Sequence, residues 1–232
     1  ACVPPEGYWR MIREICPRHD VLLIADEIMT GMGRTGKPFC VEHWGVQPDI
    51  ITSAKALSGG YSPVGAAIAS DTIIETILKG SGVFGHGHTY NANPTTAAAV
   101  TATIRFMKKN NIFENCAKRG EQFGKLLRGM LDIPFVGDVR GKGLMWGVEL
   151  VEDKETRKPF DPARKAAALV TAECMERGLV IYPGTGQIDG VEGDQFLIAP
   201  PLIVTEEQVE EIARRLRAGL EAAAEKLARK QG

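Results

Sequence analysis

The segment VQPDIITSAKALSGGYSPVGAAIAS, residues 46–70, contains the features that decide the fold. Its apolar run 49–54 predicts a short buried strand, and the glycines and proline of 59–63 prevent any regular continuation. Lys55 therefore lies at a strand end, and a second apolar strand is expected at 64–69. We expect core to flank its ammonium group, and desolvation favours the nucleophilic neutral amine that Schiff-base chemistry requires. The alternative is an ordinary solvated lysine.

Working outward, the run Val21–Ala25 is continuously apolar, which is typical of a parallel strand buried on both faces. It ends in Asp26, Glu27 and Ile28, and alternation puts Asp26 and Ile28 on one side. A carboxylate at this end of a parallel strand is where α/β sheets contact ligands. Buried there, it needs a cationic partner or several hydrogen bonds, and a protonated pyridine nitrogen is one such partner, with Ile28 packing on the ring. A helix-capping or ion-paired aspartate is the alternative.

The stretch GMGRTGK, residues 31–37, imitates two phosphate-binding motifs. Pro38 stands where a P-loop needs serine or threonine, and the same proline prevents the helix that a dinucleotide motif should open. Neither nucleotide hypothesis is therefore favoured.

The composition favours small-molecule chemistry. The 28 basic and 29 acidic residues among 232 form no long run of one sign, which argues against binding nucleic acid or an anionic membrane surface. An apolar content of 44% suits one large domain or two smaller ones. No apolar run reaches the roughly 20 residues of a membrane span, and no leader segment is seen.

Cysteine and histidine placement predicts neither disulfides nor a metal site. The five cysteines are scattered and never form a CxxC pair, a pattern that suits free thiols in a reducing cytoplasm. His86 and His88 lie close in sequence, but no further ligand completes a site. The chain opens with Ala1 and a loop-like Cys2–Pro5, so we interpret it as a fragment.

Periodicity predicts alternating helices and strands along the rest of the chain. Helices are expected at 6–16, 71–78, 95–108, 112–131, 162–177 and from a capping box at 205–208, and strands at 143–151, 179–182 and 196–199. Asn93 and Pro94 form a helix start, where free amides or the hydroxyl of Thr89 can hold an anion. The break at Asn110–Asn111 is the predicted domain boundary.

With these residues in hand, the chain resembles class III (ω-type) aminotransferases of the pyridoxal-phosphate fold type I. Five collinear blocks carry the resemblance: LLIADEIMTGMGRTG, PDIITSAKALSGGYSPVGA, GHTYNANP, VRGKGLMWGVEL and IAPPLIVTEEQV. It implies an α/β fold in which residues 1–110 form the later part of the large cofactor domain, with a mixed or parallel sheet. Residues 111–232 would form a small C-terminal α/β domain.

The resemblance also implies roles for single residues. Lys55 matches the Schiff-base lysine, which moves a proton between the two carbons of the imine, and Asp26 matches the partner of the pyridine nitrogen of pyridoxal 5'-phosphate. Ile28 matches the residue packed against the ring. Thr89 matches a threonine that reaches the cofactor phosphate of the neighbouring subunit, which implies a homodimer.

Two departures from the family pattern bear on the substrate. Residues 196–198 are apolar where amino-acid-selective relatives have an arginine, and Met29 replaces a frequent glutamine. We therefore expect an amine or ω-amino donor and a 2-oxo acid acceptor such as pyruvate. A racemase, aminomutase or decarboxylase of the same fold remains open. So does a chain inactive without its N-terminal half, because the family's phosphate loop lies upstream of Ala1.

Overall fold

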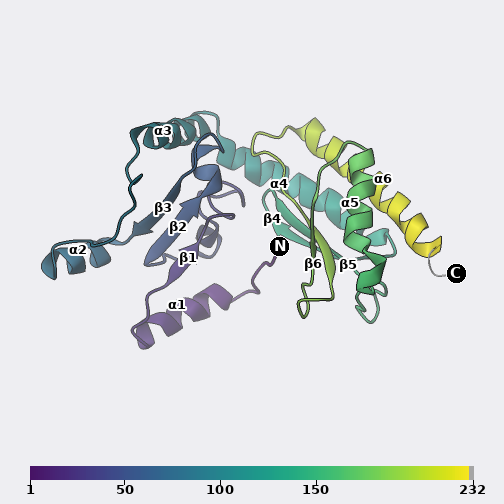
Figure 1. Cartoon of the computed structure of the whole chain (residues 1–232), viewed down its shortest axis with the longest axis horizontal. Coiled ribbons are helices and arrows are strands. Elements are labelled where there is room, and N and C mark those ends of the chain that lie inside the picture. Colours follow the sequence, from purple (N-terminus) through teal and green to yellow (C-terminus); the bar gives the residue numbers. More distant parts are fainter. Residues whose placement is uncertain (230–232) are drawn as a thin grey trace. The chain divides into compact units, whose positions relative to one another are not determined.

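The computed structural model describes residues 1–229 and divides into two compact units, which Figure 1 shows. The N-terminal unit comprises Pro4–Glu114. The C-terminal unit begins at Asn115 and also includes Ala1–Val3. The division falls close to the break that the asparagine pair predicts. No helix within the described part of the chain has the length and apolarity needed to cross a bilayer.

A three-stranded sheet organises the N-terminal unit, in the order β1 (Ile24–Asp26), β2 (Ile50–Ala54) and β3 (Gly65–Ala69). β1 and β2 are parallel, and β2 and β3 are antiparallel. The side chain of Asp49 accepts the backbone N–H of Leu23 at 2.7 Å, which joins the entries of β1 and β2. The two strands predicted around Lys55 are thus confirmed.

The prediction that the 21–25 strand is buried on both faces was wrong. Leu23 and Ala25 are buried in a cluster with Val41 and Val46. By contrast, Val21, Leu22 and Ile24 are each more than half exposed. One face of β1 packs on the unit's own core, and nothing within residues 1–229 covers the other.

Three helices and two short 3-10 turns complete the N-terminal unit: α1 (Tyr8–Arg18), η1 (Cys40–Trp44), η2 (Lys55–Ser58), α2 (Asp71–Lys79) and α3 (Pro94–Lys109). Trp9 and Ile12 of α1 pack against the core cluster. Asn93 caps α3 as predicted, because its side chain accepts the backbone N–H of Thr96 at 3.1 Å.

An antiparallel sheet of four strands organises the C-terminal unit, in the order β4-β5-β7-β6. Its strands are β4 (Val136–Lys142), β5 (Met145–Leu150), β6 (Tyr182–Thr185) and β7 (Asp194–Ile198). β4 was not predicted, and the strand expected at 179–182 begins only at Tyr182. On the inner face, Trp146 and Val148 of β5 lie opposite Ile198 and Phe196 of β7, and all four are buried.

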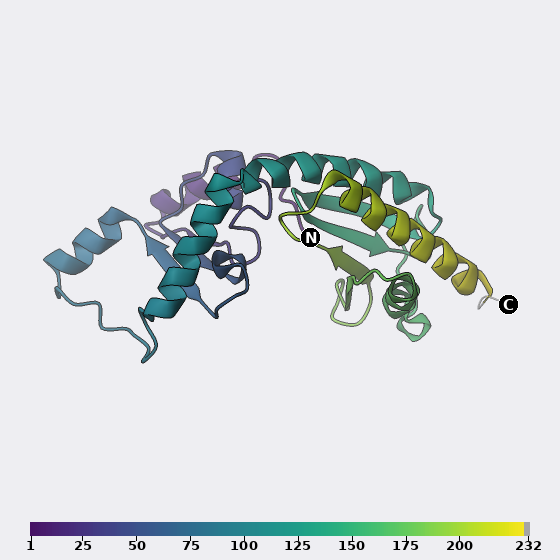
Figure 2. The same ribbon diagram turned by 90° about the horizontal axis from the view of Figure 1, so that it is seen from above.

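Three helices belong wholly or mainly to this unit: α4 (Ile112–Arg128), α5 (Ala166–Glu176) and α6 (Glu206–Arg229). α4 is followed by a short turn, η3 (Gly129–Asp132). The helix expected over 162–177 is divided, because Lys165 is left-handed (φ 51°) between η4 (Pro162–Arg164) and α5. Figures 1 and 2 show α5 and α6 packed beside one another. As predicted, α6 packs on its own unit.

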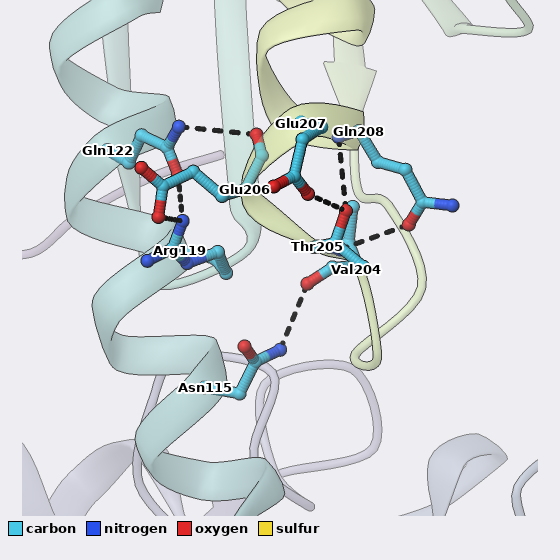
Figure 3. A network of polar contacts seen from close by, with 8 residues as sticks. All are labelled: Asn115, Arg119, Gln122, Val204, Thr205, Glu206, Glu207 and Gln208. Carbon is cyan, nitrogen blue, oxygen red and sulfur yellow. Dashed lines mark hydrogen bonds and ion pairs between the residues drawn. The ribbon is translucent and has the colours of Figure 1, made fainter.

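A polar network fastens the start of α6 to α4 (Figure 3). The guanidinium group of Arg119 donates to Glu206 at 2.5 Å and to Gln122 at 2.6 Å. The side-chain amide of Asn115 donates to the carbonyls of Leu202 and Val204. Arg119 is only 5% exposed, so this pairing satisfies a buried charge.

Candidate active site

The two residues that the sequence singled out lie at the carboxyl ends of neighbouring strands, β1 and β2. Asp26 is the last residue of β1 and is paired in register with Thr52 of β2. Lys55 follows three residues later, immediately after β2 ends at Ala54. Because the two strands are parallel, both side chains belong to the same edge of the sheet.

Asp26 presents a carboxylate with one oxygen available. Its Oδ1 accepts the backbone N–H of Ile28 at 3.0 Å, which fixes the side chain against the turn after β1. Its Oδ2 has no hydrogen-bond or ion-pair partner among residues 1–229. The side chain is exposed and Ile28 is half-buried. A carboxylate held in this way can accept a hydrogen bond from a protonated nitrogen of a ligand.

Lys55 has a backbone conformation that is uncommon for a lysine. Its φ is +48°, in the left-handed region, at the exact junction between β2 and η2. Its ammonium group makes no ion pair within the described part of the chain, and the residue is exposed. The prediction that core flanks this amine is therefore wrong for residues 1–229, in which the Lys55 side chain is exposed to solvent. Strained residues of this kind concentrate at functional sites.

A chain of hydroxyl groups holds the segment that follows Lys55. Ser58, 1% exposed, donates to the carbonyl of Ser62 at 2.6 Å. The hydroxyl of Ser62 in turn lies 2.9 Å from that of Thr96 on α3. Together with the packing of η2 on α3, these bonds stabilise the turn after Lys55.

The structure gives the glycine-rich stretch 31–37 a structural role, and no helix begins within it. A Cβ at Gly31 would lie 2.7 Å from the carbonyl oxygen of Glu27. Gly33 has φ +86°, and a Cβ there would lie 2.9 Å from the ring of Phe113. The glycines are therefore explained by close packing behind the end of β1, which agrees with the rejection of both nucleotide motifs.

Thr89 lies in an exposed turn where Asn91 donates its backbone N–H to the carbonyl of His88. No hydrogen bond or contact among residues 1–229 joins Thr89 to Asp26 or Lys55. The rings of His86 and His88 stack edge to face at 5.1 Å in the same loop. No group of three or more potential metal ligands occurs among the described residues.

The residues present fit an aldehyde-bearing, protonated heterocycle better than a metal or a phosphate. An unpaired primary amine can form an imine with the aldehyde, and a carboxylate with a free oxygen can hold the ring proton. Half-buried Ile28 follows the carboxylate by two residues and offers an apolar surface. Glu27, which sequence reasoning did not single out, lies buried between these residues.

The chain belongs to the class-III aminotransferase family, whose model matches residues 1–220. It is 44% identical over 213 residues to YodT, an uncharacterized aminotransferase of Bacillus subtilis (strain 168). That match covers 91% of this chain and 48% of the relative. It is also 36% identical over 226 residues to the adenosylmethionine-8-amino-7-oxononanoate aminotransferase of Nitratidesulfovibrio vulgaris, of which it covers 40%. The chain thus spans about half the length of the curated relatives it matches.

Solved transaminase structures share the fold. An amine transaminase from an uncultivated Pseudomonas species, in its PLP-bound internal aldimine form, matches with a TM-score of 0.88 and 36% identity. A transaminase from the marine bacterium Virgibacillus matches with a TM-score of 0.92 and 35% identity. The chain covers 49% and 50% of these structures, which cover 95% and 97% of it. The predicted resemblance and the α/β fold type I are confirmed.

Proposed function

We propose that this chain supplies the catalytic lysine and the ring-binding aspartate of a pyridoxal 5'-phosphate-dependent aminotransferase. The observation that carries the proposal is the placement of Lys55 and Asp26 at one edge of the parallel β1–β2 pair, each with an unpartnered polar group. Membership of the class-III aminotransferase family and a cofactor-bound structural neighbour support it. The proposal concerns the whole protein that contains this chain.

In this proposal each site residue acts at a stated atom. Nζ of Lys55 would hold the cofactor covalently, and as a free amine it would carry a proton between the two reacting carbons. Oδ2 of Asp26 holds the proton of the pyridine nitrogen, while its Oδ1 is fixed by the N–H of Ile28. Ile28 packs on the ring face. When bound, the cofactor supplies an electron sink for the bond-breaking step.

Thr89 takes part through a second copy of the chain. It lies in an exposed loop and makes no hydrogen bond to Asp26 or Lys55 within residues 1–229. We therefore assign it to the phosphate of a neighbouring subunit's cofactor, in a homodimer. The same proposal makes residues 1–110 part of the large cofactor domain and 111–232 the small domain. It places the protein in the cytoplasm.

The substrates we propose are an amine or ω-amino donor and a 2-oxo acid such as pyruvate. Residues 196–198 are phenylalanine, leucine and isoleucine, so they provide no guanidinium group for an α-carboxylate. One relative carries a name that supports a donor amine remote from an α-carboxylate, the probable gamma-aminobutyrate transaminase 3 of Oryza sativa subsp. indica. The name of the adenosylmethionine-8-amino-7-oxononanoate aminotransferase does not add to this support, because adenosylmethionine is an α-amino acid.

Borohydride trapping tests the covalent step. Reduction of the natural full-length protein with pyridoxal phosphate should fix the cofactor on the peptide containing Lys55, as read by mass spectrometry. Lys55→Ala should abolish this label. The exposed Lys79, which pairs with Glu75 on α2, gives a control, because Lys79→Ala should retain the label. A label that survives Lys55→Ala would refute the assignment.

Product analysis tests the reaction itself. With pyruvate as acceptor and a series of primary amines as donors, the full-length protein should form alanine and the corresponding carbonyl product. If the cofactor is trapped at Lys55 but no donor yields alanine, the site is right and the transaminase assignment is wrong.

A further inference from the structure

Glu27 is a buried carboxylate with no cation beside it. Only 2% of the residue is exposed, and none of its oxygens is within ion-pair distance of a lysine, arginine or histidine in residues 1–229. Its partners are neutral. Oε1 accepts the backbone N–H of Val41 at 2.8 Å, and Oε2 accepts the hydroxyl of Thr30 at 2.5 Å. Burying a carboxylate costs free energy, which hydrogen bonds such as these offset in the absence of an opposite charge.

The backbone of Glu27 is fixed on both sides as well. Its N–H donates to the carbonyl of Thr52 on β2 at 2.9 Å, so strand pairing continues one residue past the end of β1. Its carbonyl accepts the N–H of Gly31 at 2.9 Å. Four hydrogen bonds therefore anchor one residue to β2, to the following turn and to η1. Few orientations remain for the peptide group that joins Glu27 to Asp26.

Alternation along the strand connects this anchor to the proposed site. Asp26 lies on the exposed face of β1, whereas Glu27 lies on the buried face. Fixing Glu27 therefore fixes the direction in which the Asp26 carboxylate leaves the strand. Ile28 donates its N–H to Asp26 Oδ1 at 3.0 Å. It lies in the turn between Glu27 and Thr30, and the hydrogen bond from the Thr30 hydroxyl to Glu27 Oε2 spans that turn.

We propose that Glu27 is a positioning residue for Asp26: its buried carboxylate clamps the end of β1 to η1 and to the turn at Thr30, and thereby holds the aspartate toward the cofactor's ring nitrogen. This rests on the proposed function. Glu27 itself touches neither cofactor nor substrate. Supporting residues that orient a primary ligand commonly change affinity about tenfold or more when removed.

A double-mutant cycle in the natural full-length protein tests this role. Glu27→Ala should weaken pyridoxal phosphate binding about tenfold, as measured by titrating the visible absorption band, and the isosteric Glu27→Gln should weaken it less. In an Asp26→Asn background, adding Glu27→Ala should cause little further loss of cofactor affinity, because Glu27 acts by orienting the Asp26 carboxylate. Equal losses in both backgrounds would overturn the proposal and leave Glu27 as a general stabiliser.

A matched control and two further readouts make the outcome unambiguous. Glu42→Gln makes the same chemical change in a carboxylate of η1 that accepts the backbone N–H of Phe39, and cofactor affinity should be unchanged. The pH midpoint of the cofactor band should move in Glu27→Gln but not in Glu42→Gln, with circular dichroism confirming that both fold. A wild-type affinity and midpoint in Glu27→Gln and Glu27→Ala would refute the inference alone. Failure of the wild type to trap cofactor at Lys55 would refute the proposed function.

Discussion

At the scale of single residues, Gly124 allows α4 to lie directly on the indole ring of Trp146. A Cβ added at Gly124 would come within 2.2 Å of that ring, far inside van der Waals contact. We expect Gly124→Ala to lower the free energy of unfolding by about 1–3 kcal/mol, because the ring must move or the helix must shift. Urea denaturation followed by tryptophan fluorescence measures this.

Gly129 provides the matched control for that prediction. It follows α4 in η3, and a Cβ there would meet no atom within 4 Å. Gly129→Ala should therefore leave the midpoint of unfolding nearly unchanged or raise it slightly, because alanine restricts the unfolded chain. Equal destabilisation by both substitutions would contradict the role of the Trp146 contact.

In the candidate site, some residues could be predicted from the sequence and others could not. Asp26 and Lys55 were predicted, because a charge at the end of an apolar strand is a local signal. The left-handed backbone of Lys55 was not predicted, since only glycine or asparagine indicates that conformation in a sequence. Glu27 was missed because one glutamate among many carries no sign that its side chain is buried. The roles of Lys55, Asp26, Ile28 and Thr89 all stay predictions.

At the scale of elements, the capping box at the start of α6 is a confirmed prediction. The hydroxyl of Thr205 accepts the N–H of Gln208 at 3.3 Å, and the side chain of Gln208 accepts the N–H of Thr205 at 3.0 Å (Figure 3). Thr205→Ala should lower the unfolding free energy by about 1 kcal/mol, because the backbone N–H of Gln208 loses its acceptor. Thr205→Ser, which keeps the hydroxyl, should remain near wild type in the same denaturation assay.

The α5–α6 contact makes a pH-dependent contribution to stability through Glu173. Hydrogen bonds from Lys226 and Arg177 hold the pKa of this carboxyl below its usual value. A group whose folded pKa is lowered stabilises the fold above its unfolded pKa, roughly 4.3. That contribution is lost as the pH falls through the folded value. The gap in unfolding free energy between wild type and Glu173→Gln should therefore be present at neutral pH and shrink below about pH 4.3.

Chemical denaturation at a series of pH values measures that gap. Glu176→Gln is the control, because Glu176 is exposed on the same helix and forms no ion pair among the described residues. It should show a smaller difference from wild type at every pH. A gap for Glu173→Gln that stays constant down to acid pH would show that the loss reflects packing rather than charge.

Element prediction succeeded where the pattern was strong and failed where glycine or tertiary packing decided. The helices with apolar stripes were found, including α3, α4 and α6. β4 was missed because VGDVRGK contains two glycines and three charges, and a register shift between Val136 and Asp138 interrupts its alternation. β6 was placed too early because Leu179 and Ile181 are buried, yet their backbone is not in the sheet. Burial alone does not specify strand pairing.

At the scale of the whole molecule, the buried core is distributed unevenly between the two units. The largest fully buried side chains all belong to the C-terminal unit: Phe123, Phe196, Leu127, Met130, Leu144, Leu150, Leu216, Leu220, Val136, Val148, Val170 and Val209. In the N-terminal unit a cluster of four buried residues packs on one side of the sheet, and large apolar side chains such as Leu22 and Ile24 remain exposed. Composition predicted enough apolar residues for a core, but not how they would be divided.

This uneven distribution predicts unequal local stability within the 232-residue chain on its own. Amides of β5 and of the central turns of α6 should exchange with deuterium far more slowly than those of β1, β2 and β3, because opening the former exposes much more apolar surface. Hydrogen exchange followed by mass spectrometry measures this on peptides from both units in one sample, so pH and temperature are identical. Gly124→Ala should accelerate exchange in β5 and leave β1–β3 unchanged. Protection of β2 equal to that of β5 would contradict the prediction and mean that the N-terminal sheet is stabilised by more than its four-residue cluster.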